Sequence, residues 1–157
     1  MPPYCQNVYV QLDVAIESLI GILRSLNEDD LTARPTEGKM SVGELLAHIS
    51  MLCEADFRIG SGASQAEMEQ FYSAAQPELA LPDIERALRH HYAASKQAAE
   101  RLTEEEWNAP SVSYWGTSYT RFGWLLETLA HLYHHRGQLH AMLVHALRKD
   151  PRVPLFE

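Results

Sequence analysis

The sequence predicts an all-α protein whose four main helices form a bundle. Apolar residues recur at steps of three and four over four long stretches, and few stretches alternate as strands do. The chain has 157 residues, of which 46% are hydrophobic and 22% are charged. This length and composition predict one domain, residues 1–157, with enough apolar residues for a buried core.

The first predicted helix runs from about Gln6 to Leu26. Its apolar residues share one face and are Val8, Leu12, Ala15, Ile16, Leu19, Leu23 and Leu26. An acidic turn, Arg34-Pro35 and Gly38 follow, and this combination ends a helix and predicts a connector.

The second helix begins at a capping box, Ser41-Val-Gly-Glu44. The Ser41 hydroxyl and the Glu44 carboxylate accept hydrogen bonds from amides that the first turn of a helix leaves unpaired. The helix is predicted to run to about Ile59. Its buried side is expected to carry Leu45, His48, Ile49, Leu52 and Ile59.

Residues 60–81 are rich in Gly, Ser, Ala and Gln and form a long predicted connection, with a helical piece near Gln65 to Ser73. A crossover of this length indicates that the second and third helices are not hairpin neighbours. Pro82 opens the third helix, which is expected to reach about Leu102.

The last quarter of the chain contains a short capped turn, a loop and the fourth helix. The turn is Thr103-Glu-Glu-Glu106, and the loop is the aromatic, Gly- and Ser-bearing segment APSVSYWGTSYTRFG. The loop is too polar for a core segment. The fourth helix is predicted from about Phe122 to Leu147.

Charge and cysteine content exclude several classes of protein. Thirteen basic residues against 21 acidic ones give a net charge of -8, so we expect no nucleic-acid partner. Two cysteines without CxxC spacing fit a reducing compartment better than a secreted disulfide scaffold. The N-terminal segment does not read as a signal sequence, and no apolar run reaches the roughly 18 residues of a membrane span. We therefore expect a cytoplasmic protein without membrane partners.

The segment HLYHHRGQLH, residues 131–140, holds four of the eight histidines. At about 100° per residue, His131 and His135 share a helix face, His134 lies at its edge and His140 lies opposite. The i, i+4 spacing lets two imidazoles on successive turns bind one metal ion. His145, two turns further on, is a weaker candidate.

His48 is the third candidate ligand, because it lies among apolar residues on the predicted core face of the second helix. A hydrogen-bonded core histidine is the alternative interpretation. If the second and fourth helices are neighbours, His48, His131 and His135 converge, which is the ligand set of a catalytic zinc site with an open fourth position.

The segments SVGELLAHI, residues 41–49, and HLYHHRGQL, residues 131–139, resemble the DinB/YfiT-like superfamily of bacterial four-helix-bundle proteins. The resemblance extends to Arg34-Pro35, to Trp115-Gly116 and to the tail Pro151 to Phe156. One departure is Met40, where family members often have Trp.

The resemblance implies a divalent metal ion, often nickel or zinc, bound by His48, His131 and His135. It also implies an up-down-down-up arrangement with a long crossover, and a homodimer. Some members of the family resemble S-transferases or isomerases that use bacillithiol, mycothiol or glutathione. A small-molecule substrate, such as a low-molecular-weight thiol, is therefore expected.

Three histidines with an open position can bind a metal that turns water or a thiol into a nucleophile. Leu132 stands where a protease HExxH motif needs Glu, so that class is excluded. A metal-assisted thiol S-transferase is the leading hypothesis, and a non-catalytic metal-binding protein associated with stress or damage is the alternative. The catalytic residues and the residues that bind an organic cofactor are not predicted.

Other polar residues have two interpretations each. Gln138 and Thr128 either orient a bound water or substrate or pack the helix. Glu44 either accepts the imidazole proton of His48 or only caps its helix. Arg136 is either a structural residue, ion-paired at a packing or dimer interface, or a binder of an acidic substrate, and we favour the structural role.

The two cysteines and three loop aromatics have no predicted role in metal binding. Cys53 is expected to be a small buried hydrophobe, whereas Cys5 precedes the first helix and has no assigned role. Tyr114, Trp115 and Tyr119 either line a pocket or pack over the end of the bundle.

Overall fold

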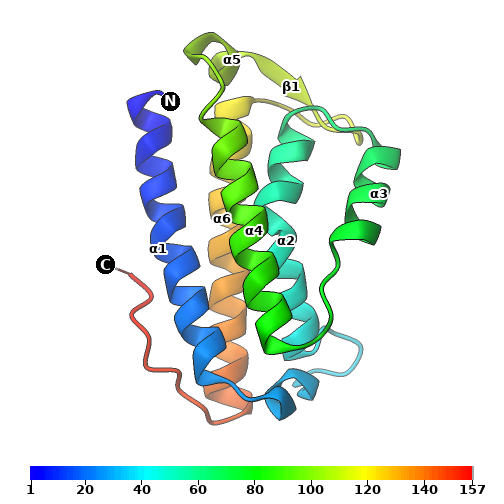
Figure 1. Ribbon diagram of the computed structural model, residues 1–157, viewed down its shortest axis with the longest axis vertical. Helices are drawn as coiled ribbons and strands as arrows, with labels where there is room; N and C mark the ends of the chain where they lie inside the picture. Colours follow the sequence, from blue (N-terminus) through cyan, green and yellow to red (C-terminus); the bar gives the residue numbers. More distant parts are fainter. Residues whose placement is uncertain (157) are drawn as a thin grey trace.

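Four long helices form the bundle in the computed structural model, which describes residues 1–156. They are α1 (Pro3–Ser25), α2 (Val42–Gly60), α4 (Leu81–Ala99) and α6 (Arg121–Ala141). Helices α2 and α4 run in one direction and α1 and α6 in the other, which confirms the up-down-down-up four-helix bundle (Figure 1). Both α2 and α1 pack against α4 and α6, so the four helices surround one core.

Local sequence signals fix where several helices begin. At the start of α2 the Glu44 amide donates to Ser41 Oγ at 3.2 Å, and the Ser41 amide donates to Glu44 Oε2 at 2.7 Å, so the predicted capping box is confirmed. The same reciprocal pair opens α5 (Glu104–Asn108) through Thr103 and Glu106. Such boxes satisfy amides that would otherwise stay unpaired.

The crossover between α2 and α4 contains the predicted helical piece, α3 (Gln65–Ala75). Helix α3 lies along the outside of the bundle, beside α2 (Figure 1). Its Met68 and Phe71 pack in a small cluster with Met51 and Ala55 of α2 and Trp124 of α6. This second cluster ties the crossover to the end of the bundle where α2 stops and α6 begins.

The contact between α2 and α6 is close at Gly60. A methyl group placed on Gly60 would lie 2.6 Å from Cβ of Trp124, a separation that real Cβ atoms do not adopt. Only glycine therefore allows Trp124 to lie against the last turn of α2 without a shift.

Three predicted boundaries are wrong by a few residues. Helix α4 ends at Ala99 rather than Leu102, and α6 gives way to a π-helical turn, η2 (Met142–Ala146), before Leu147. Helix α1 begins at Pro3, so Cys5 is a buried residue of its first turn and does not precede the helix. A short 3-10 turn, η1 (Glu28–Thr32), follows α1.

The aromatic segment before α6 contains a two-stranded hairpin that the sequence did not predict. Strands β1 (Pro110–Val112) and β2 (Ser118–Thr120) pair antiparallel with Ser111 opposite Tyr119. Gly116 turns the chain between them at φ +95°, a conformation that side chains disfavour. Three-residue strands are too short to give a period-two pattern.

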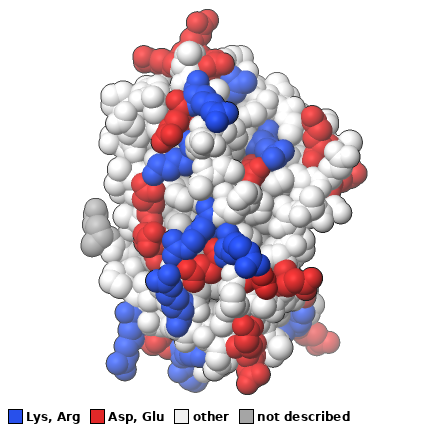
Figure 2. Space-filling view, viewed as in Figure 1, with Lys and Arg blue, Asp and Glu red and all other residues white. Residues whose placement is uncertain are grey.

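The charges on the face shown in Figure 2 are mixed: Lys and Arg lie among Asp and Glu without forming a continuous basic stripe. This face therefore lacks the electrostatic footprint of a nucleic-acid binder. Among the helices of residues 1–156, none is apolar over a long enough run to cross a bilayer.

Candidate metal centre

Three histidines meet between α2 and α6. The Nε2 atoms of His48 and His135 are 3.2 Å apart, and one ligand nitrogen from each of His48, His131 and His135 lies within 4.8 Å of the others. Two nitrogens bound to one tetrahedral zinc ion at about 2.0–2.1 Å would lie about 3.3–3.4 Å apart. The structure thus brings together the three residues that the sequence singled out, and the His48–His135 separation is close to the value for two ligands of one ion.

The remaining ring nitrogens of His131 and His135 have hydrogen-bond acceptors. His131 Nδ1 donates to Asp56 Oδ2 at 3.0 Å, and His135 Nδ1 donates to Gln138 Oε1 at 2.9 Å. A carboxylate or an amide oxygen only accepts, so the proton of each ring is on Nδ1 and the lone pair is on Nε2. This is the tautomer that a metal-binding histidine needs.

The electrostatics of the three rings differ. The hydrogen bond to Asp56 raises the pKa of His131 above its ordinary value, because the carboxylate stabilises the charged ring. Burial lowers the pKa of His48, with a further contribution from His135, and burial also lowers the pKa of His135. Neutral rings at His48 and His135 are ready to donate a lone pair to a metal.

A groove of about 530 Å³ opens beside His131. Its walls come from α2, α3, the hairpin loop and α6, and its lining residues include Tyr72, Tyr114, Trp115, Trp124, Glu127 and His134. Tyr114 and Trp115 line this groove as one interpretation of the sequence expected. Tyr119 is not among the lining residues and packs edge-on against Trp124 at 5.1 Å between ring centroids.

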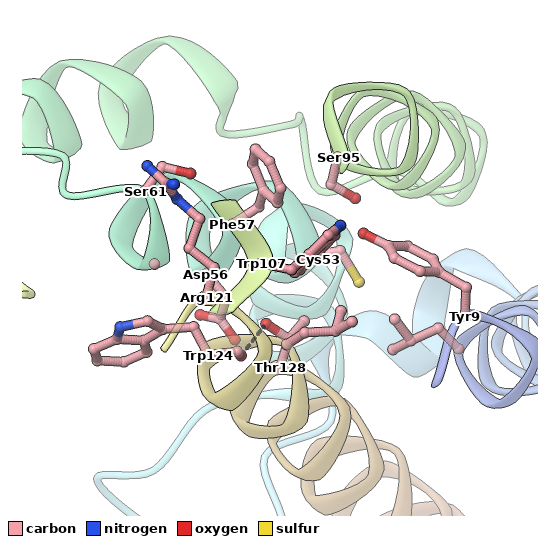
Figure 3. A pocket seen from close by; sticks show the side chains of 13 residues that line it. Tyr9, Cys53, Asp56, Phe57, Ser61, Ser95, Trp107, Arg121, Trp124 and Thr128 are labelled. Atoms are coloured by element: carbon pink, nitrogen blue, oxygen red, sulfur yellow. Dashed lines mark hydrogen bonds between the residues drawn. The ribbon is translucent and has the colours of Figure 1, made fainter. Parts of the chain in front are cut away.

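A second, smaller space lies between the helices and is drawn in Figure 3. Cys53, Asp56, Trp107, Arg121 and Thr128 are among its lining residues. Its free volume is about 20 Å³, little more than the roughly 10–15 Å³ that a water molecule needs. The groove, and not this space, is therefore the part of the site with room for a substrate.

Of the other residues predicted near the site, one contacts a histidine and two have structural roles only. Gln138 accepts a hydrogen bond from His135, a role that neither interpretation of the sequence predicted. Thr128 Oγ1 donates to the Trp124 carbonyl at 3.0 Å and so belongs to the packing of α6. Glu44 caps α2 and accepts from Arg34 at 2.9 Å, and it makes no hydrogen bond to His48. The proposed role of Glu44 as a partner of His48 is therefore wrong.

Arg136 is buried, with 2% of its surface exposed. It donates to Ser18 Oγ at 3.0 Å, and its guanidinium lies over the Tyr133 ring at 4.2 Å and the Phe156 ring at 5.2 Å. Within residues 1–156 it has no carboxylate partner, so the predicted ion pair is absent there. Arg136 packs α6 against α1 and the C-terminal segment.

The cysteines do not join the histidines. Cys53 is buried, as predicted, and burial raises the pKa of its thiol, so it stays a neutral small side chain. Cys5 is fully buried in the core, and burial raises its pKa to about 11.

Asp56 is the site residue that sequence reasoning missed. It lies two turns after His48 on α2, with 16% of its side chain exposed, inside a helix that is otherwise largely buried. A carboxylate in such a helix was the available signal, because a buried charge needs a partner. That partner, His131, is 75 positions away.

The fold and this site together define a class of protein, namely four-helix bundles in which three histidines converge beside an open groove. The chain belongs to the DinB superfamily, whose sequence profile matches residues 11–139. No curated protein matches the chain significantly.

Solved structures agree with this assignment. A DinB-family protein from Exiguobacterium sibiricum is 31% identical, with a TM-score of 0.84 over 99% of both chains. A DinB-like protein from Bacillus subtilis is 20% identical, with a TM-score of 0.72 over 94% of this chain and 95% of its own. The mycothiol-dependent maleylpyruvate isomerase shares the fold, with 13% identity and a TM-score of 0.65 over 88% of this chain and 61% of its own.

Proposed function

We propose that His48, His131 and His135 bind a divalent metal ion, zinc or nickel, and that the protein is a metal-assisted S-transferase for a low-molecular-weight thiol. The observation that carries this proposal is the convergence of three ring nitrogens beside a groove, with the protons of two rings held on the opposite nitrogen by Asp56 and Gln138. Trihistidine sites accept several first-row ions, so the donor set alone does not choose between the two metals.

The chemistry follows from the residues that surround the rings. When bound, the ion would supply a positive charge that holds a thiol as its thiolate. Asp56 keeps the His131 ring in the orientation and tautomer that leaves Nε2 free. The aromatic walls of the groove would hold an apolar electrophile next to the thiolate and exclude water from it.

A relative supports the substrate class. The mycothiol-dependent isomerase, which shares the fold, uses a low-molecular-weight thiol in its reaction. In the transfer proposed here the thiol loses its proton to solvent, and the thiolate sulfur forms a bond to an electrophilic carbon. With an epoxide one C–O bond breaks, and the oxygen stays on the neighbouring carbon and takes up a proton. With a chloroaromatic the C–Cl bond breaks and chloride leaves with the electron pair.

The proposal is tested by mixing the metal-loaded protein with a panel of small thiols and with styrene oxide or chlorodinitrobenzene. We expect thioether formation above the uncatalysed rate, lost in His135→Ala and kept in His140→Ala, whose ring lies on another face of α6. Activity that persists in His135→Ala or after metal removal would overturn the mechanism. Metal binding without any turnover across the panel would favour the alternative, a non-catalytic metal-binding protein.

We also propose that the protein is a cytoplasmic homodimer. The support is the family assignment for the dimer and, for the compartment, two buried free thiols in place of a disulfide. Light scattering at micromolar concentration tests the dimer, and a monomeric mass would contradict it.

A further inference from the structure

Four aromatic side chains from three parts of the chain line the groove beside the histidines. Tyr72 comes from α3, Tyr114 and Trp115 from the hairpin loop, and Trp124 from α6. Trp115 packs edge-on against Tyr114 at 4.7 Å and against Trp124 at 6.0 Å. Yet Trp115 remains 53% exposed and Tyr114 45% exposed. The rings are therefore held in place by one another, but Trp115 and Tyr114 are only partly covered by protein.

The charged residues of the same groove are acidic. Asp56 and Glu127 both line it, and no Lys or Arg is among its lining residues. Asp56 accepts a hydrogen bond from His131, whereas Glu127 has no hydrogen bond or ion pair within residues 1–156. A carboxylate without a hydrogen-bond or ion-pair partner in the described part of the chain thus lies beside exposed aromatic rings.

We propose that this groove binds an organic ammonium group, either a protonated amine or a quaternary ammonium. The faces of aromatic rings are electrostatically negative and attract such cations, most strongly at Trp. Glu127 adds a full negative charge, and a carboxylate-bearing ligand would be repelled. Apolar ligands would gain the aromatic contacts only, so an ammonium ligand would bind more tightly than an apolar ligand of the same shape.

The position of Glu127 indicates that the ammonium group belongs to the thiol substrate. Glu127 is one helical turn before His131 on α6, about 6 Å along the helix axis. A small aminothiol could therefore direct its sulfur toward the histidines while its ammonium group lies at Glu127. This assignment of the cation to the thiol substrate rests on the proposed function, whereas cation binding by the groove does not require a metal.

The test uses the full-length protein as purified and a matched pair of probes. Choline and 3,3-dimethyl-1-butanol have almost the same shape, but only choline carries a charge. Titration monitored by tryptophan fluorescence is expected to show choline binding about tenfold more tightly than the neutral probe. Equal affinities for the two probes would overturn the proposal.

Variants locate the binding in the groove. Trp115→Ala and Glu127→Gln are each expected to weaken choline binding several-fold, with little effect on the neutral probe. Trp115→Phe should retain most of the affinity, because it keeps an aromatic face. Glu105→Gln, a change at an exposed carboxylate of α5, is the matched control. Unchanged choline binding in both Trp115→Ala and Glu127→Gln would overturn the assignment.

Two further experiments distinguish a failure of this inference from a failure of the proposed function. In His135→Ala we expect choline to bind at least as tightly as in the unmodified protein, because the groove residues remain and the positive charge of the metal is lost. In the thiol assay, 2-aminoethanethiol is expected to be used more efficiently than mercaptoacetate. Preference for mercaptoacetate would contradict the ammonium assignment, whereas an inactive protein that still selects choline would contradict the transferase proposal alone.

Discussion

His131 donates a hydrogen bond from Nδ1 to Asp56 Oδ2 at 3.0 Å. The bond joins α6 to α2 beside the groove. It fixes the ring tautomer, raises the pKa of His131 and leaves Nε2 free, in a ring that lies beside those of His48 and His135. Asp56 thus supports His131, and His131 is a candidate metal ligand. In such arrangements the carboxylate affects how strongly the histidine ring binds the metal ion.

Replacing Asp56 is therefore expected to weaken metal binding without removing a ligand. Loss of such an outer partner costs about 10–100-fold in affinity. We expect Asp56→Ala to reduce zinc affinity by that factor, measured by titration calorimetry, while the circular dichroism spectrum stays helical. Asp29→Ala, at an exposed position in η1, should bind zinc normally. Identical zinc affinities in the two variants would show that Asp56 does not support the ring.

Gln138 is expected to act on His135 in the same way but more weakly, because its amide is neutral and the residue is exposed. Gln138→Leu removes the acceptor and should lower zinc affinity several-fold. Gln138→Glu keeps an acceptor and adds charge, which makes the ring a better donor, so its affinity should equal or exceed that of the unmodified protein. The order Glu, Gln, Leu in competition with a chromogenic chelator checks this prediction, and any other order contradicts it.

Two glycines are expected to respond oppositely to alanine. In Gly60→Ala the new methyl group would collide with Trp124, and such overpacking costs about 1–3 kcal/mol of folding free energy. Gly137 lies in the interior of α6 with nothing within 4 Å of an added Cβ, so Gly137→Ala should stabilise the protein by about 0.5–1 kcal/mol. Urea denaturation measures both. A Gly60→Ala variant as stable as the unmodified protein would contradict the close contact between Gly60 and Trp124.

Glu54 is expected to make stability depend on pH in the acidic range. Burial raises its pKa, but hydrogen bonds from His91 at 2.7 Å and Arg58 at 2.6 Å outweigh burial and hold the pKa below its ordinary value of 4.5. A lowered pKa means that the folded state binds the proton less tightly than the unfolded state. The stabilisation is complete above pH 4.5 and is lost as the pH falls through the lower, folded-state pKa.

Glu54→Gln tests this dependence. We expect the variant to lose about 1–3 kcal/mol at pH 7, because charged hydrogen bonds to Arg58 and His91 are removed. The difference from the unmodified protein should shrink as the pH approaches 3. Urea denaturation at several pH values measures the effect, with Glu105→Gln as control. A difference that is constant over this range would mean that the Glu54 carboxylate is not the titrating group.

Local signals in the sequence predicted most of the fold. The capping box at Ser41 and Glu44 and the helical periodicity are set by residues within a few positions of one another, so they were visible without the structure. The hairpin at residues 110–120 was not visible in the sequence. Its strands are too short for an alternating pattern, and its pairing depends on the turn at Gly116.

The site was only partly visible for the same reason. Helical geometry brought His131 and His135 to one face, and the apolar neighbours of His48 marked it as unusual. Asp56 was missed because its partner is on another helix, 75 positions away. Arg136 was expected to pair with a carboxylate, and its stacking on Tyr133 and Phe156 depends on where the C-terminal segment lies.

Metal content is the most direct test of the central claim that His48, His131 and His135 form one metal site. The protein should be purified without a histidine tag and analysed by inductively coupled plasma mass spectrometry, together with alanine variants of the three histidines and of His140. We expect one zinc or nickel ion per chain in the unmodified protein and in His140→Ala, and almost none in the other three variants. Metal-free protein that fails to bind zinc or nickel, or full occupancy in His48→Ala, would contradict it.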